Sequence, residues 1–143
     1  MMRLEHANLI VHDVDSMIEF LRTAFPESWI RAEGRSPLGV RWVHVGTDET
    51  YIALSEATKE PAEAWVPYGG KPGTNHLGYE VEDADALRRR MRAAGYPDST
   101  VPNDHPARTR VYFHDPEGND WEFVQYHSDA PAERNDYEIP DVT

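Results

Sequence analysis

The stretch "TNHLGYEVEDAD" at residues 74–85 decides the fold, because the chain carries nearly the same pattern as "LEHANLIVHDVD" at residues 4–15. Each copy has a histidine, then strand-like residues, then Asp-x-Asp. The matched pairs, all 70 positions apart, are His6 with His76, Asp13 with Asp83, and Asp15 with Asp85. Polar groups that repeat in one fixed register indicate a duplicated structural unit.

The bulk composition is that of one globular domain of 143 residues, with 39% hydrophobic and 28% charged residues and no cysteine. The absence of cysteine excludes disulfides, thiolate metal sites and a cysteine nucleophile. A net charge of -12 argues against nucleic acid as a partner. No apolar run is long enough to cross a membrane or to form a signal core, which predicts a protein of the cytoplasm without a membrane partner.

The first half is predicted to fold as strand, helix and three strands, over residues 3–56. A strand at 4–11 is followed by a helix that Asp15 could cap and that Pro26 ends. Three strand candidates follow: "SWIRAEG", "VRWVHVG" and "TYIALSE".

The second half, residues 74–127, repeats this order. A strand at 75–82 leads to a helix capped near Asp83 or Asp85. A short or irregular segment fills 98–107, and the strands "RTRVYFH" and "DWEFVQY" are joined by the turn "DPEGN". Residues 57–73 read as a connector rich in proline and glycine, and 128–143 as a polar tail. The predicted class is α+β, with two tandem βαβββ modules in one domain, 1–143.

The repeat singles out one carboxylate as a candidate metal ligand. At the 70-residue offset Glu122 falls opposite the apolar Ile52, on a strand whose two faces are both apolar. An enclosed carboxylate needs a cation, a hydrogen-bond network or a metal. If the halves pack with pseudo-twofold symmetry, His6 and His76 approach one another and form a two-His-one-carboxylate set with Glu122. Such a set leaves about three positions open on an octahedral divalent ion.

The chain resembles the vicinal oxygen chelate superfamily, which includes glyoxalase I, extradiol dioxygenases, fosfomycin-resistance thiol transferases and bleomycin-binding proteins. The stretches that carry the resemblance are "LEHANLIVHDVDSMIEFL", "NHLGYEVEDADAL" and "VYFHDPEGNDWEFVQY". The resemblance implies a glyoxalase-like fold, a pseudo-twofold curved mixed sheet, and a homodimer. It also implies that His6, His76 and Glu122 bind a divalent metal ion (Fe²⁺, Mn²⁺, Ni²⁺ or Zn²⁺).

The family pattern is not complete in this chain. The fourth ligand position, a glutamate in glyoxalase I, corresponds to Ile52, which argues against true glyoxalase I activity. Tyr112 precedes the Asp–Pro turn as in the fosfomycin-type enzymes. The stretch before it, "VPNDHPARTR", lacks their array of lysine and serine, which argues against that activity.

Five further residues are candidates for the pocket. Glu80 shares the inward parity of His76 and is the predicted general base, although it could instead reach solvent at the end of its strand. Tyr112 is predicted to face the substrate, against the alternative of a core aromatic. Residues predicted to line or contact the substrate are Asn8, Glu56 and His105, the last on a loop.

The leading hypothesis is a metal-dependent enzyme of lyase or isomerase type, acting on a small-molecule substrate that chelates the metal through two adjacent oxygens. One alternative is an Fe(II) ring-cleaving dioxygenase of the extradiol type, which the ligand set suits. The other is a non-catalytic binding protein similar to the bleomycin-resistance proteins. Whether the ligands come from one chain or from two subunits is left open.

Overall fold

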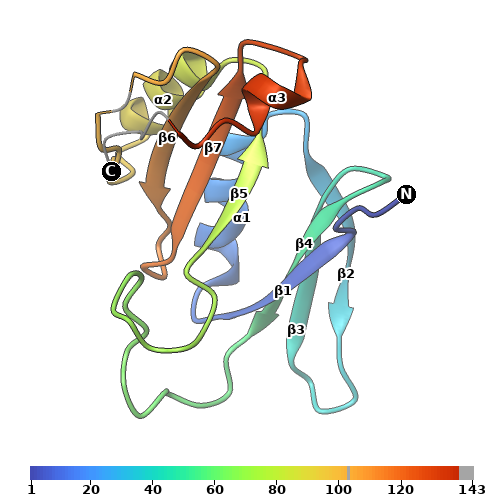
Figure 1. Ribbon diagram of the computed structural model, residues 1–143. Coiled ribbons are helices and arrows are strands. Elements are labelled where there is room, and N and C mark those ends of the chain that lie inside the picture. The colour runs from blue at the N-terminus through green and yellow to red at the C-terminus, as the bar shows by residue number, and fades with distance from the viewer. Residues whose placement is uncertain (103, 139–143) are drawn as a thin grey trace. The chain divides into compact units, whose positions relative to one another are not determined.

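The computed structural model describes residues 1–102 and 104–138, and the chain divides into two compact units, Met1–Ala64 and Trp65–Thr143. The first unit contains a four-stranded sheet and one helix, and the second a three-stranded sheet and two helices (Figure 1).

The first unit follows the predicted order of strand, helix and three strands. Its elements are β1 (His6–Val11), α1 (Val14–Ala24), β2 (Trp29–Arg35), β3 (Arg41–Gly46) and β4 (Tyr51–Glu56). The sheet order is β1-β4-β3-β2, with β1 parallel to β4 and the other pairs antiparallel. The helix packs on β3 and β4 and buries Met17, Phe20 and Leu21 completely or nearly so.

The N-terminus of α1 corrects one prediction. Asp13, and not Asp15, is the N-cap, and its side chain accepts a hydrogen bond from the backbone N–H of Ser16 at 3.0 Å. Asp15 lies in the first helical turn, where a negative charge is favourable, and it pairs with Arg41 at 2.9 Å. The repeat holds here, because Asp83 caps the second helix through Ala86 in the same way.

The second unit begins with a strand, a helix and two further strands. Its elements are β5 (His76–Glu80), α2 (Ala84–Ala93), β6 (Arg108–His114), β7 (Asp120–Tyr126) and the short α3 (Pro131–Arg134). The sheet order is β5-β7-β6, with β5 parallel to β7 and β6 antiparallel to it. Where the first unit has its second strand, the described residues of the second have an isolated bridge between Asp98 and Phe113.

The two faces of the second sheet have opposite character. Because side chains alternate along a strand, Val111, Phe113, Trp121 and Phe123 share one face, and each is at most 1% exposed. This is the face that α2 covers with Leu87 and Met91. The other face carries the charged residues and Tyr112 of the same strands, so the hydrophobic core fixes which side chains are available for chemistry.

The tail packs back on the second unit as far as it is described, through residue 138. Arg134 donates two hydrogen bonds to Glu80, at 3.1 and 2.9 Å, and its guanidinium lies 3.9 Å from the ring centre of Tyr126. Arg108 donates to the carbonyl of Asp136 at 3.0 Å. Part of the predicted tail, residues 139–143, lies outside the described residues. No helix in the described chain is long and apolar enough to span a membrane.

The turn between β6 and β7 depends on one buried carboxylate. Asp115 is 5% exposed and accepts hydrogen bonds from the backbone N–H groups of Glu117 and Asn119, at 2.8 and 2.9 Å. It also accepts from the indole N–H of Trp121 at 2.9 Å. Gly118, with φ 83°, completes the turn in a conformation that glycine adopts without strain.

We expect Asp115→Ala to lower the free energy of unfolding by about 3 kcal/mol, because several buried donors lose their acceptor at once. The measurement is urea denaturation followed by circular dichroism. Asp48→Ala, at an exposed turn of the first unit, is the matched control and should change stability by less than about 0.5 kcal/mol. Equal stability of the two variants would show that the turn does not depend on this carboxylate.

Candidate metal centre

The polar face of the second sheet gathers two metal-ligating side chains. His76 on β5 and Glu122 on β7 lie on neighbouring strands, and His76 Nε2 is 3.0 Å from Glu122 Oε2. Their side chains are 31% and 17% exposed, so both are enclosed but reachable. Gly78 stands opposite Glu122 in the strand register, and a Cβ there would lie 3.7 Å from Glu122 Oε2. That distance is ordinary van der Waals contact, so a small side chain at position 78 would touch the carboxylate without displacing it.

Tyr112 on β6 borders the pair from the other side of β7. It is the register partner of Glu122, and its ring makes an edge contact with the His76 ring at 6.2 Å between centres. Burial raises the pKa of Tyr112 above its usual value, and the charge of Glu122 raises it further. The phenol therefore stays protonated at neutral pH and serves as a hydrogen-bond donor on this face.

Arg110 adds a positive charge to the same face, two residues before Tyr112. Its Nη1 lies 3.9 Å from Glu122 Oε1, and its side chain is 16% exposed. Sequence reasoning did not select this residue. The signal was available, because Arg110 has the same strand parity as Tyr112 and a guanidinium in a half-buried strand needs an anionic partner.

The other predicted pocket residues have different surroundings. Glu80 forms the ion pair with Arg134, and the hydrogen bonds from Arg134 are the first cause of its lowered pKa. That ion pair disfavours the predicted role of Glu80 as a general base. His105 is not a solvent-exposed loop residue: its side chain is 1% exposed, and Nδ1 accepts from the N–H of Ala107 at 3.1 Å.

The first unit holds the remaining predicted residues. His6 lies on β1, stacks on Tyr51 at 4.8 Å between ring centres, and contacts Glu5 through Nδ1 at 2.6 Å. Asn8 accepts a hydrogen bond from Ser55 at 3.4 Å. Glu56, at the end of β4, accepts from the backbone N–H of Arg41 at 3.4 Å.

The ring stack of His6 continues along the face of the first sheet. Tyr51 also stacks on His44, at 4.5 Å between ring centres, and the guanidinium of Arg31 lies 4.3 Å from the centre of the Tyr51 ring. Burial is the first cause of a lowered pKa at His44, with the charge of Arg31 second. His44 therefore tends to be neutral beside the predicted ligand His6.

The chain's family is established by comparison of its sequence. Residues 3–123 match the model of the Glyoxalase/Bleomycin resistance protein/Dioxygenase superfamily. The chain belongs to this superfamily. No curated protein sequence gives a significant match.

Solved structures of superfamily members confirm the glyoxalase-like fold class. FosX, a fosfomycin resistance protein from Listeria monocytogenes, is 17% identical with a TM-score of 0.70, over 94% of this chain and 98% of that one. A glyoxylase/bleomycin resistance protein/dioxygenase domain from Frankia is 21% identical with a TM-score of 0.70, over 88% and 98%. A glyoxalase family protein from Bacillus cereus is 17% identical with a TM-score of 0.72, over 88% and 95%. Other structures of the Listeria FosX contain Mn(II), in one case with 1S,2S-dihydroxypropylphosphonic acid.

The donors that the second unit brings together fit a divalent metal ion of the kind implied by the superfamily resemblance. An imidazole nitrogen and a carboxylate oxygen face one position, and both are ligand types that Mn, Fe, Ni and Zn accept. Within residues 1–102 and 104–138 no cluster of three or more histidine, aspartate or glutamate side chains is suited to a metal. The three-ligand set takes His6 from the first unit and the other two ligands from the second, so it stays a prediction.

We expect Tyr112→Phe to remove a phenol that ionises well above pH 10. The raised pKa means that the folded chain holds this proton more tightly than the unfolded chain, where the phenol has its ordinary pKa of 10.0. Stability from this group is therefore complete below pH 10 and is lost as the pH rises beyond it. Ultraviolet titration of the phenolate band, compared between wild type and variant, makes the measurement. If the phenol missing from the variant is one that ionises near or below pH 10, the raised pKa of Tyr112 is contradicted.

Proposed function

We propose that this superfamily member is a divalent-metal-dependent enzyme of lyase or isomerase type, acting on a small substrate with two adjacent oxygens. The observation that carries the proposal is the His76–Glu122 donor pair, 3.0 Å apart on a polar sheet face that also presents Tyr112 and Arg110. His6 is the proposed third ligand, at the position matching His76 in the repeat. A bound divalent ion would supply Lewis acidity toward the oxygens of the substrate.

The chain's own residues would bind and orient the substrate. Tyr112, kept protonated by burial and by the charge of Glu122, donates a hydrogen bond to a substrate oxygen that gains negative charge. Arg110 supplies a positive charge on the same face. Both groups favour a substrate with an anionic or strongly polarised oxygen. The ligand bound with Mn(II) in the Listeria FosX structure, which has hydroxyls on adjacent carbons, is a compound of this general class.

The proposed proton acceptor is Glu80, on the same strand face as His76. To act as a base it has to leave the ion pair with Arg134, which lowers its pKa. Asn8, Glu56 and His105 remain the proposed substrate-contacting residues.

We predict about one divalent ion per chain in the wild type, the number that one three-ligand site holds. The ion should be lost in Glu122→Ala, in His76→Ala and in His6→Ala. Elemental analysis after dialysis, with folding checked by circular dichroism, makes the measurement. Glu80→Gln is the matched control: it also removes a carboxylate charge from the polar face, and it should keep the metal.

The identity of the metal separates the competing reactions. Iron together with cleavage of a catechol ring would select the extradiol-type dioxygenase, whereas Mn, Ni or Zn favours the lyase or isomerase. Wild-type protein that stays empty when offered each of these ions would overturn the metalloenzyme proposal. A non-catalytic protein that binds small molecules, as the bleomycin-resistance members of the superfamily do, would then be the better account.

We also propose that the chain forms a homodimer, as the family resemblance implies. Sedimentation equilibrium should give twice the chain mass of 16.4 kDa. Mixing His6→Ala chains with Glu122→Ala chains tests how the ligands are shared. Restored metal binding in the mixture would show that one site draws ligands from two subunits, and its absence would place each site within one chain.

A further inference from the structure

Tyr68 has an unusual backbone conformation for its size. Its φ is 61°, and among the described residues it is the non-glycine position with positive φ. A positive φ of this size is sterically unfavourable for a residue with a Cβ. Glycine adopts it easily, yet the position is occupied by Tyr68 and not by Gly69 or Gly70, which follow it directly. The conformation is held by the backbone N–H of Tyr68, which donates to Asn75 Oδ1 at 2.7 Å. A bulky side chain kept in a glycine-like conformation points to a task for that side chain.

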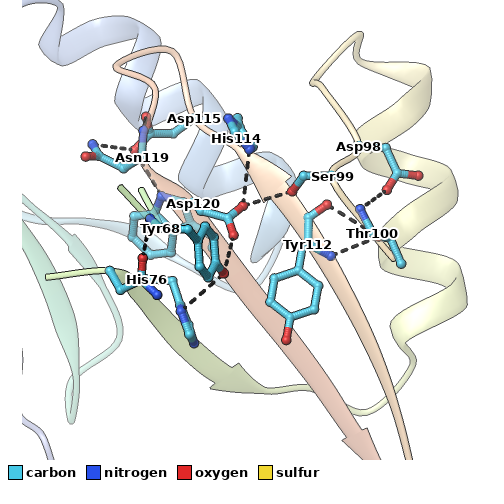
Figure 2. A network of polar contacts seen from close by, with 12 residues as sticks. Tyr68, His76, Asp98, Ser99, Thr100, Tyr112, His114, Asp115, Asn119 and Asp120 are labelled. Atoms are coloured by element: carbon cyan, nitrogen blue, oxygen red, sulfur yellow. Dashed lines mark hydrogen bonds and ion pairs between the residues drawn. The ribbon is translucent and has the colours of Figure 1, made fainter. Parts of the chain in front are cut away.

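The side chain of Tyr68 connects His76 with a buried carboxylate. Its hydroxyl donates to Asp120 Oδ2 at 2.8 Å and lies 3.3 Å from His76 Nδ1 (Figure 2). The two rings stack at 6.0 Å between centres with an angle of 25°. Burial raises the pKa of Tyr68, and the hydrogen bond to Asp120 raises it further, so the phenol keeps its proton.

Asp120 is an anchored acceptor at the far end of this chain of contacts. It is 3% exposed, and it pairs in register with His76 across the β5–β7 ladder. Ser99 donates to its Oδ1 at 2.9 Å, and His114 Nε2 lies 3.5 Å from the same oxygen. The Oδ2 atom is therefore the one that accepts from Tyr68, and a carboxylate has no proton to give back.

These contacts determine what each nitrogen of His76 does. Tyr68 has a single hydroxyl proton, which Asp120 takes, so toward His76 the hydroxyl oxygen can only accept. His76 Nδ1 must then be an N–H donor to Tyr68. Nε2 lies 3.0 Å from Glu122 Oε2, and because a carboxylate only accepts, Nε2 donates a proton to it in the metal-free protein. A metal ion bound by both side chains would take the place of that Nε2 proton.

We propose that Tyr68 is a positioning residue for the metal ligand His76, because its hydroxyl links His76 Nδ1 to Asp120 and fixes the ring with Nε2 toward Glu122. The inference deepens the proposed function and rests on it insofar as His76 is a metal ligand. The orientation of the ring and its Nδ1–H contact with Tyr68 are properties of the metal-free protein. Hydrogen-bonded residues behind a ligating histidine typically change metal affinity by about 10- to 100-fold.

The test is Tyr68→Phe, which keeps the stacked ring and removes only the hydroxyl. Nuclear magnetic resonance spectra of the histidine side chains in metal-free protein should show the Nδ1–H proton of His76 protected from exchange with water in the wild type and rapidly exchanging in the variant. Affinity for Mn(II) or Zn(II), measured by calorimetry, should fall by about 10- to 100-fold. Tyr137→Phe, an exposed tyrosine of the same unit, is the matched control and should change neither readout.

A double-mutant cycle with Asp120→Asn extends the test. If Asp120 acts through Tyr68, the two substitutions together should weaken metal binding no more than the stronger one alone. Thermal unfolding of each variant identifies any loss of affinity that comes from misfolding. Additive effects would show that Asp120 acts on the site independently of Tyr68 and would overturn the proposed linkage.

The spectra and the affinities separate failure of this inference from failure of the proposed function. Unchanged protection of the His76 Nδ1–H proton in Tyr68→Phe overturns the positioning role whether or not metal binds. Lost protection with unchanged metal affinity overturns the part of the inference that concerns the metal. If the wild type binds no metal but the protection is lost in the variant, the link to His76 is supported and the proposed function fails.

Discussion

Two carboxylates on one central strand are the constraint around which the polar face of the second unit is organised. Asp120 and Glu122 both belong to β7. Asp120 is 3% exposed as a whole residue, and the side chain of Glu122 is 17% exposed. A carboxylate removed from water costs several kcal/mol unless hydrogen bonds or cations replace the lost solvation. The neighbouring strands and the segment before β5 supply these partners, which explains why the polar residues of this unit gather on a single sheet face.

The two carboxylates are satisfied in different ways, and the difference has a chemical consequence. Asp120 accepts hydrogen bonds from the hydroxyls of Tyr68 and Ser99, and His114 Nε2 lies 3.5 Å from it, so its role is completed within the protein. Glu122 Oε2 lies 3.0 Å from His76 Nε2, and Arg110 stays at 3.9 Å. A cation bound by His76 and Glu122 would take the place of the proton that joins them in the metal-free protein. The asymmetry favours Glu122 as the carboxylate that binds a ligand.

The internal repeat made much of the local structure predictable, because it depends on short-range rules. A strand, an aspartate cap and an amphipathic helix occur in both halves, and the caps at Asp13 and Asp83 follow from side-chain hydrogen bonds within three residues. The single error at the first cap arose because Asp15 is also acceptable near a helix N-terminus, where it favours the helix dipole. The family resemblance, and with it the fold class, could be identified from three strands. Two of them begin at the repeated histidines His6 and His76, and the third contains Glu122.

Contacts between distant segments were not predictable from the same rules. The ion pair of Glu80 with Arg134 joins residues 54 positions apart, and the register of a tail against a sheet leaves no periodic signal. His105 was expected to contact substrate from a loop, yet its side chain is buried: Nδ1 accepts a local backbone hydrogen bond, and the tail comes within 3.8 Å of Nε2 at Asp136. Nothing in the local sequence around Tyr68 reveals its partner Asp120, 52 positions away.

The link through Tyr68 also makes the segment before β5 part of the site in an energetic sense. The backbone of Tyr68 is held by Asn75, and its hydroxyl by Asp120 and His76, so the conformation of residues 68–75 and the orientation of His76 stabilise each other. Such coupling is reciprocal: whatever fixes His76 must stabilise the segment by the same free energy that the segment contributes to the ligand. The glycines of this segment allow the backbone to reach the required conformation, while the tyrosine connects it to the chemistry. A loop position with an unfavourable φ can therefore be retained because its side chain holds the orientation of His76, the proposed metal ligand.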